Sequence, residues 1–284
     1  MLGAICGDIL GSNYEFEKIK YSNPSEIQLM NIFDTFTDDT AMTLAVADWL
    51  LHDIHTTDDD EQLKKMLADR FVTWAFTHLN PRTLGFGDNF WQWLCKIKLI
   101  QDYTPINSFG NGSGMRVSPV GWFFDTLEET LRFAKLSADV SHNHPEGEKG
   151  AMCIAAAIFL ARTGKSKKEI KDYLYETFKY EELNKTVAEL RESCKWSEIC
   201  QDTVPMSVVA FLESDDYPSA IQLAVSYGSD SDTIGDMSGA IAEAYYGSIP
   251  DDIVSFCLSK LPDVIIETCI EFSKKKKMPV KDNH

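Results

Sequence analysis

Hydrophobic and polar positions along the chain recur mostly at a spacing close to 3.6 residues, which places apolar side chains on one face of a helix. This pattern predicts helices at 38–51, 59–78, 127–138, 146–162, 167–178, 206–213, 220–227, 232–246, 251–261 and 262–276. Alternating stretches typical of strands are almost absent, and no strand–helix–strand rhythm occurs. The predicted fold class is therefore all-α.

No long segment rich in proline, glycine and serine separates the chain into domains. Its 284 residues suffice for one large core, so we predict a single domain over 1–284. The stretch 182–201 is polar and poorly periodic, which predicts a surface excursion. The longest apolar run, 151–161, is shorter than the ~20 residues of a membrane helix, so we predict a buried core helix and no membrane span.

The chain is strongly acidic, with 27 Lys and Arg against 44 Asp and Glu and a net charge of −17. Such a protein repels a nucleic-acid backbone, so direct nucleic-acid binding is not expected. The seven cysteines are scattered without a Cys-x-x-Cys pair, which favours reduced thiols over disulfides or a zinc site. The first basic residue is Lys18, so no signal peptide is predicted and a cytoplasmic location is expected.

Two groups of acidic and hydroxyl side chains stand where apolar helices are predicted to begin. They are Thr37, Asp38, Asp39 and Thr40, and then Ser229, Asp230, Ser231, Asp232 and Thr233. Helix capping explains one such residue at each helix start. Adjacent carboxylates repel one another unless a cation lies between them or one is protonated. If the two helices pack together, four carboxylates converge, and such hard oxygen ligands suit two Mg²⁺ or Mn²⁺ ions.

A calcium-binding EF-hand is a competing interpretation of Asp230 and Asp232. Its loop needs an oxygen ligand at the fifth position and a glutamate at the twelfth, where this chain has Ile234 and Ile241. The next predicted helix also begins at once and leaves no room for a calcium loop. The sequence therefore excludes an EF-hand.

A glycine-rich segment at 109–116 reads Phe-Gly-Asn-Gly-Ser-Gly-Met-Arg. Small residues let a ligand approach the backbone, and free N–H groups there can hold a diphosphate. The segment lacks the Gly-Lys-Ser/Thr of a Walker A loop, and no strand precedes it as in a Rossmann motif. A mobile surface loop is the alternative. Further on, His142 and His144 fit a polar turn before a helix, and zinc is not expected because no cysteine or third histidine lies nearby.

These features, in this order, closely resemble the ADP-ribosylglycohydrolase family, the enzymes similar to dinitrogenase-reductase-activating glycohydrolase. The marks include Gly-Ala-Ile-Cys-Gly-Asp-Ile-Leu-Gly at 3–11, Tyr-Glu-Phe at 14–16, both acidic groups, the loop at 110–116 and Ser-His at 141–142. Any one of these motifs is modest support. Together, they extend over about residues 1 to 250 and identify the family by their shared order.

The resemblance implies an orthogonal helical bundle with a dinuclear Mg²⁺ or Mn²⁺ centre. It implies metal ligands at Thr37, Asp38, Asp39, Asp230, Asp232 and Thr233. It places the diphosphate and ribose of ADP-ribose near Gly110, Asn111, Gly112, Ser113, Gly114, Met115 and His142. Some members carry a glutamate that covers the site, and Glu15 matches it, with Glu17 as the alternative. The run Gly-Phe-Gly-Asp at 85–88 follows Arg-Thr-Leu and departs from the family's usual Arg-Gly-Tyr-Gly, which affects substrate contacts rather than metals.

Hydrolysis at the anomeric carbon of ribose passes through an oxocarbenium-like transition state and needs a delivered water. Divalent metals can bind ribose hydroxyls and lower the pKa of a bound water. We predict that Asp39 orients or deprotonates this water, and that Glu15 is a mobile lid residue or proton donor. The predicted protein is a monomeric, metal-dependent ADP-ribosyl hydrolase acting on modified protein, with arginine and serine as the first candidate acceptors.

Other functions stay open at this point. Nucleic-acid base adducts or free O-acetyl-ADP-ribose are alternative substrates. A catalytically silent ADP-ribose-binding or structural protein is the second hypothesis, although all six matching ligand positions are intact. A metal phosphohydrolase is the third. It would use a His-Asp pair, but His52 and Asp53 stand at the polar end of their helix, where a solvated pair is the simpler interpretation.

Overall fold

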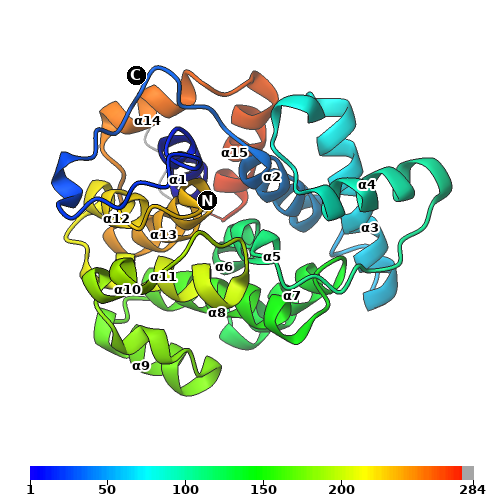
Figure 1. Ribbon diagram of the computed structural model, residues 1–284. Helices are drawn as coiled ribbons and strands as arrows, with labels where there is room; N and C mark the ends of the chain where they lie inside the picture. The colour runs from blue at the N-terminus through cyan, green and yellow to red at the C-terminus, as the bar shows by residue number, and fades with distance from the viewer. Residues whose placement is uncertain (277–284) are drawn as a thin grey trace.

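The computed structural model describes residues 1–276 and confirms the all-α prediction (Figure 1). Within this range no strand forms, and one isolated antiparallel bridge joins Gly110 and Ile199. The helices are α1 (Leu2–Ser12), α2 (Asp38–His52), α3 (Asp60–Thr73), α4 (Asp88–Ile100), α5 (Gly112–Met115), α6 (Ser118–Phe123), α7 (Leu127–Asp139), α8 (Pro145–Arg162), α9 (Lys167–Phe178), α10 (Val187–Ser193), α11 (Cys200–Glu213), α12 (Tyr217–Val225), α13 (Ser231–Tyr246), α14 (Asp251–Leu258) and α15 (Asp263–Lys276). Residues 277–284 of the predicted single domain lie outside the described part.

Most of the predicted helices recur with ends shifted by three residues or fewer. The one predicted at 206–213 instead begins at Cys200, and Pro205 lies inside α11. Helix α1 was not predicted, since residues 3–11 are all buried and no polar face marks a period. Helix α4 was also missed, although its buried Phe90, Trp93, Leu94 and Ile97 have the spacing of a helical stripe.

The stretch 182–201 lies at the surface as predicted, since most of its side chains are exposed or half-buried, but it is not irregular. This stretch includes α10, whose Val187 and Leu190 are buried in the core. At the start of α10, the polar residues Thr186 and Glu189 form a reciprocal capping box that stabilises the helix end. The polar composition therefore reflects helix ends and exposed faces, while a few apolar side chains hold the segment to the core.

Helix α8 carries the predicted apolar run and confirms it as a buried core helix. Apart from half-buried Met152, residues 151–161 are buried. Helices α5, α6, α7, α11 and α13 all pack against α8. Among residues 1–276, no helix combines the length and the apolar character that crossing a membrane would require.

Helices α1 and α13 cross through a seam of small residues, and they lie against each other in Figure 1. A Cβ built at Gly7 would lie 2.1 Å from the carbonyl oxygen of Gly235. One built at Gly3 would lie 2.4 Å from the carbonyl oxygen of Gly239. The helices therefore run antiparallel in near backbone contact, and α1 also contacts α2. This packing brings together the starts of α2 and α13, where both acidic groups stand.

The substitution Gly7→Ala tests this seam. Helix propensity alone predicts that alanine stabilises a helix over glycine by about 0.5–1 kcal/mol. The clash with Gly235 reverses the sign, and we expect the free energy of unfolding to fall by about 3 kcal/mol. Urea denaturation followed by circular dichroism measures this change. An unchanged or higher stability would show that α1 and α13 are not in backbone contact.

Candidate functional site

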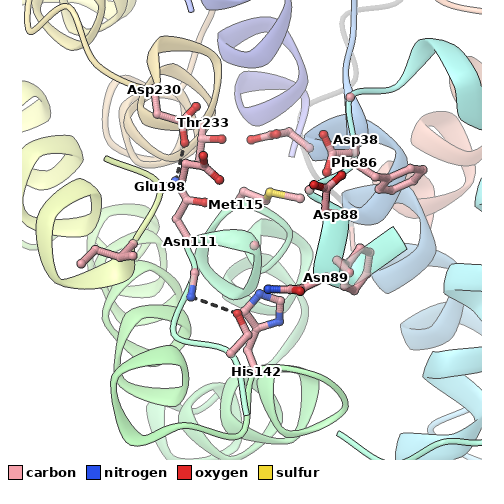
Figure 2. Close-up of a pocket in the computed structure, with 18 of the residues that line it drawn as sticks. Asp38, Phe86, Asp88, Asn89, Asn111, Met115, His142, Glu198, Asp230 and Thr233 are labelled. Atoms are coloured by element: carbon pink, nitrogen blue, oxygen red, sulfur yellow. Dashed lines mark hydrogen bonds between the residues drawn. The ribbon is translucent and has the colours of Figure 1, made fainter. Parts of the chain in front are cut away.

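A cavity of about 1140 Å³ opens between the start of α2, the start of α13, the turn after α1 and the glycine-rich segment. Its wall includes most of the predicted site residues, namely Glu15, Thr37, Asp38, Asp39, Gly110, Asn111, Gly112, Met115, His142, Asp230, Asp232 and Thr233. Figure 2 shows Asp38 on one side of this cavity and Asp230 and Thr233 on the other. The structure thus places the two acidic groups around one cavity, although they are far apart in sequence.

Two of the predicted substrate-binding residues do not line the cavity. The Ser113 hydroxyl donates a hydrogen bond to the Gly147 carbonyl at 2.8 Å, which fastens the segment to α8. Gly114 lies against Met237 and Val204. Residues 113–116 are buried, so the glycine-rich segment is not a mobile surface loop, and α5 begins within it.

Asp8 on α1 holds the first acidic group in place. Its fully buried carboxylate accepts hydrogen bonds from the Thr37 N–H at 3.0 Å and the Thr37 hydroxyl at 2.8 Å. The Thr40 N–H and hydroxyl donate to the same carboxylate. Burial raises the pKa of Asp8 to about 6, against the effect of these hydrogen bonds. Sequence reasoning used Asp8 only as part of a motif, although an acid within an apolar, glycine-rich stretch is a signal in itself.

Capping accounts for only part of the two groups. Thr37 caps α2 by accepting a hydrogen bond from the Asp39 N–H at 3.3 Å. Asp230 holds the N-cap position of α13, yet its side chain makes no capping hydrogen bond. Its Oδ2 instead accepts from the Asn111 side-chain amide at 2.6 Å, drawn as a dashed line in Figure 2. Oδ1 of Asp39 and of Asp232 is buried without a hydrogen-bond partner among the described residues.

The acidic groups carry charge that no basic side chain balances. No ion pair in the described part of the chain involves Asp38, Asp39, Asp230 or Asp232. Burial and neighbouring carboxylates raise the pKa of Asp38, Asp39 and Asp232 well above the usual range. Burial raises the pKa of Asp230 to about 7. Such clustered carboxylates require protons or cations nearby.

The donor set fits divalent cations. Glu15, Asp230 and Asp232 each offer a carboxylate oxygen, and these oxygens lie within 4.8 Å of one another. The unpartnered buried oxygens of Asp39 and Asp232 are also available. All of these ligands are hard oxygen atoms, a chemistry that suits Mg²⁺ or Mn²⁺ rather than zinc.

Glu15 rather than Glu17 faces the cavity. Burial, followed by the charges of Asp232, Asp8 and Glu198, raises the pKa of Glu15 to about 8. Glu17 is exposed, accepts a hydrogen bond from the Tyr21 hydroxyl at 3.1 Å and does not line the cavity. The geometry therefore distinguishes the two candidates that the sequence left open.

Residues 194–199, here called the strap, form a part of the wall that sequence reasoning missed. Trp196, Ser197, Glu198 and Ile199 line the cavity. The Trp196 indole N–H donates to the Glu15 carbonyl at 3.3 Å, and the Glu198 carbonyl accepts from the Asn111 N–H at 2.8 Å. The strap thus connects the turn that carries Glu15 to the glycine-rich segment. Its only sequence signal was an apolar tryptophan within a polar stretch.

The two histidines have different roles. His144 caps α8, since its Nδ1 accepts a hydrogen bond from the Glu146 N–H at 3.2 Å, and it does not line the cavity. His142 is buried on the cavity wall, with its ring near Phe90 and against Gly112. A polar turn before a helix therefore explains His144, whereas His142 belongs to the site (Figure 2).

Gly112 leaves space for this histidine ring. A Cβ built at Gly112 would lie 2.9 Å from His142 Nε2. We expect Gly112→Ala to displace the ring and weaken ADP-ribose binding by about tenfold, or about 1.4 kcal/mol. Titration calorimetry measures the affinity. Gly87→Ala is the matched control, because it lies on the same wall with no atom within 4 Å of the added Cβ. Equal affinities of the two variants would contradict the prediction.

Comparisons with known proteins identify the family of this chain. The family model of ADP-ribosylglycohydrolase matches residues 1–274. The ADP-ribosylhydrolase ARH3 of Mus musculus is 25% identical over 328 residues, covering 90% of this chain and 86% of the mouse protein. The human ARH3 is 30% identical over 196 residues, covering 53% of this chain and 54% of the human protein. A solved ADP-ribosylglycohydrolase-related protein complex matches 97% of this chain and 95% of its own, with TM-score 0.69 and 23% identity.

Proposed function

The chain belongs to the ADP-ribosylglycohydrolase family, and we propose that it is a metal-dependent hydrolase that removes ADP-ribose from a modified acceptor. The observation that supports this proposal most is that two acidic groups face one cavity with no ion pair to a basic side chain in the described part of the chain. The same cavity carries the glycine-rich segment and His142. One site thus combines candidate cation ligands with backbone donors for a diphosphate.

The proposed cation ligands are Thr37, Asp38, Asp39, Asp230, Asp232 and Thr233, and together they would hold two Mg²⁺ or Mn²⁺ ions. When bound, these ions supply positive charge at the ribose hydroxyls and at a water. Asp8 positions Thr37, and Asn111 positions Asp230, through the hydrogen bonds described above. These contacts fix the ligands before substrate arrives, which is the arrangement that efficient electrostatic catalysis needs.

The remaining steps of the proposal fall to protein side chains. Asp39 orients and deprotonates the attacking water. Glu15, which faces the cavity beside Asp230 and Asp232, donates a proton to the leaving acceptor. The Gly112 N–H and the His142 ring bind the diphosphate away from the carboxylates, since the N–H groups of Gly110 and Asn111 already donate to the Ser108 hydroxyl and the Glu198 carbonyl. This separation matters because the acidic wall repels the anionic part of the substrate.

Defined substrates test this function. We propose a protein acceptor with ADP-ribose on arginine or serine, so the assay uses one peptide of each kind. The expected result is release of ADP-ribose from one peptide, its loss after EDTA treatment, and its recovery when Mg²⁺ or Mn²⁺ is added. Hydrolysis that is unaffected by EDTA contradicts the metal-dependent mechanism. Tight ADP-ribose binding without turnover on any adduct, in a metal-replete sample, would instead establish a silent binding protein.

A further inference from the structure

Arg116 is a buried cation without an anionic partner. Its side chain is 0% exposed, and no ion pair within residues 1–276 involves it. Its guanidinium carbon lies 4.4 Å from the centre of the Phe71 ring, and Nε and Nη1 have no hydrogen-bond partner among the described residues. Burial lowers its pKa to about 9, so it remains charged at neutral pH. Burying a charge without an anionic partner is energetically unfavourable, so Arg116 has a role beyond filling space.

The one nitrogen of Arg116 that forms hydrogen bonds contacts the segment before His142. Nη2 donates to the Ser137 carbonyl at 3.0 Å and to the Ser141 hydroxyl oxygen at 2.9 Å. The same Ser141 oxygen lies 2.8 Å from Nδ1 of His142. The three side chains thus form a continuous buried chain of hydrogen bonds from Arg116 to the cavity wall.

Donor counting decides the direction of this chain. A guanidinium can only donate, so Ser141 accepts from Arg116. Ser141 is fully buried, and among the described residues Nδ1 of His142 is the one atom within hydrogen-bond distance that can accept its hydroxyl proton. If Nδ1 itself carried a proton, the Ser141 O–H would be left buried and unpaired, which is unfavourable. Nδ1 is therefore the acceptor, and the ring proton resides on Nε2.

We propose that Arg116 and Ser141 are positioning residues that hold His142 as the neutral Nε2–H tautomer, so that Nε2–H donates to an oxygen of the bound diphosphate. Nε2 faces Gly112 and Gly110, where a Cβ would lie 2.9 Å and 3.7 Å from it. It makes no hydrogen bond within the described residues. The identity of the ligand rests on the proposed function, whereas the tautomer does not.

The positive charge of Arg116 also helps to keep the His142 ring neutral. Burial and the nearby guanidinium hold the pKa of His142 well below its usual range, so the ring remains neutral. A neutral ring with its proton on Nε2 offers one fixed donor to the ligand. A ring free to exchange tautomers would present an acceptor to the anion for part of the time, which weakens binding.

Nuclear magnetic resonance tests the tautomer directly in the wild-type protein. Long-range ¹H–¹⁵N spectra of protein labelled at histidine distinguish a protonated from an unprotonated ring nitrogen, and the His142→Gln variant assigns the signal. We expect Nε2 protonated and Nδ1 unprotonated at neutral pH, without ligand. A proton on Nδ1, or a mixture of both tautomers, would overturn the proposal whether or not the protein hydrolyses anything.

Binding of ADP-ribose in the presence of Mg²⁺ tests the consequence. We expect Ser141→Ala to mix the tautomers and to weaken binding by about tenfold, with KM raised and kcat little changed. Ser141→Thr keeps the hydroxyl and is expected to restore both the tautomer and the affinity. Ser137→Ala is the matched control, because it removes a buried hydroxyl bonded to Ala134 but keeps the carbonyl that Arg116 uses.

The outcomes separate this proposal from the function on which it rests. If wild-type protein with an Nε2–H ring binds no ADP-ribose, the ligand assignment fails and the tautomer assignment stands. If Ser141→Ala keeps the wild-type spectrum and affinity, Ser141 does not position the ring. If Ser141→Ala does not fold, the proposal is tested by the wild-type spectrum and by the affinity of Ser141→Thr for ADP-ribose. A ring without the Nε2–H tautomer, or a Ser141→Thr affinity below that of the wild type, contradicts it.

Discussion

Asp232→Asn is expected to lower kcat/KM at least about a thousandfold, a loss of about 4 kcal/mol of transition-state stabilisation. Asparagine has the same shape but no charge, so the change removes one anionic ligand from the proposed pair of cations. Asp232 is buried, and one of its oxygens has no partner in the described part of the protein. The measurement is turnover of whichever peptide adduct the wild-type protein hydrolyses. Asp38→Asn and Asp39→Asn are expected to behave in the same way.

The fold of these variants is expected to survive. Without cations, burial and neighbouring acids raise the pKa of Asp232, so its charge opposes folding and its removal does not destabilise the protein. Circular dichroism and titration with Mn²⁺ separate loss of metal binding from loss of structure. Glu17→Gln is the control, because Glu17 is exposed, does not line the cavity and lies outside the predicted ligand set. An Asp232→Asn protein that retains activity within tenfold would refute the dinuclear centre.

The acidic groups could be predicted from sequence because their chemistry is local. Two carboxylates beside hydroxyls at a helix start are more than a cap requires, and this excess is visible in the printed sequence. Their joining depends on α1 and α13, whose glycines let two backbones touch. Local periodicity carries no sign of that contact, because a helix buried on all sides lacks the polar face that marks its period.

The rest of the wall could not be predicted because it depends on contacts between distant segments. Trp196 reaches the Glu15 turn across 181 positions of sequence, and Asn111 reaches Asp230 across 119. Arg116 was part of a recognised motif, yet its link to His142 through Ser141 exists only after α5 has packed against α7. Composition predicted a surface for the strap, whereas backbone hydrogen bonds to the glycine-rich segment make it part of the site.

Mg²⁺ is expected to stabilise the protein more as the pH rises from about 4 to about 8. In the protein without cations, the pKa is raised to about 6 for Asp8, about 7 for Asp230 and about 8 for Glu15. Each group has its usual pKa near 4 in the unfolded chain. Below that pH both states are protonated, and the contribution of these groups to stability is fully present. As the pH rises through the folded pKa values the protons are lost, and so is that contribution.

For Asp8 alone, the raised pKa corresponds to a loss of about 3 kcal/mol of folding stability as the pH rises from below the unfolded pKa to above the folded one. Cations replace the lost protons at the acidic wall, so their stabilising effect must grow over the same range of pH. Urea denaturation at several pH values, in EDTA and in Mg²⁺, measures the difference between the two conditions. Taking that difference cancels the pH-dependent contributions of groups far from the cations, such as Glu169, whose pKa is lowered to about 2. An Mg²⁺ effect that is equal at pH 5 and pH 8, or that persists in Asp232→Asn, would mean that these carboxylates do not bind the cation.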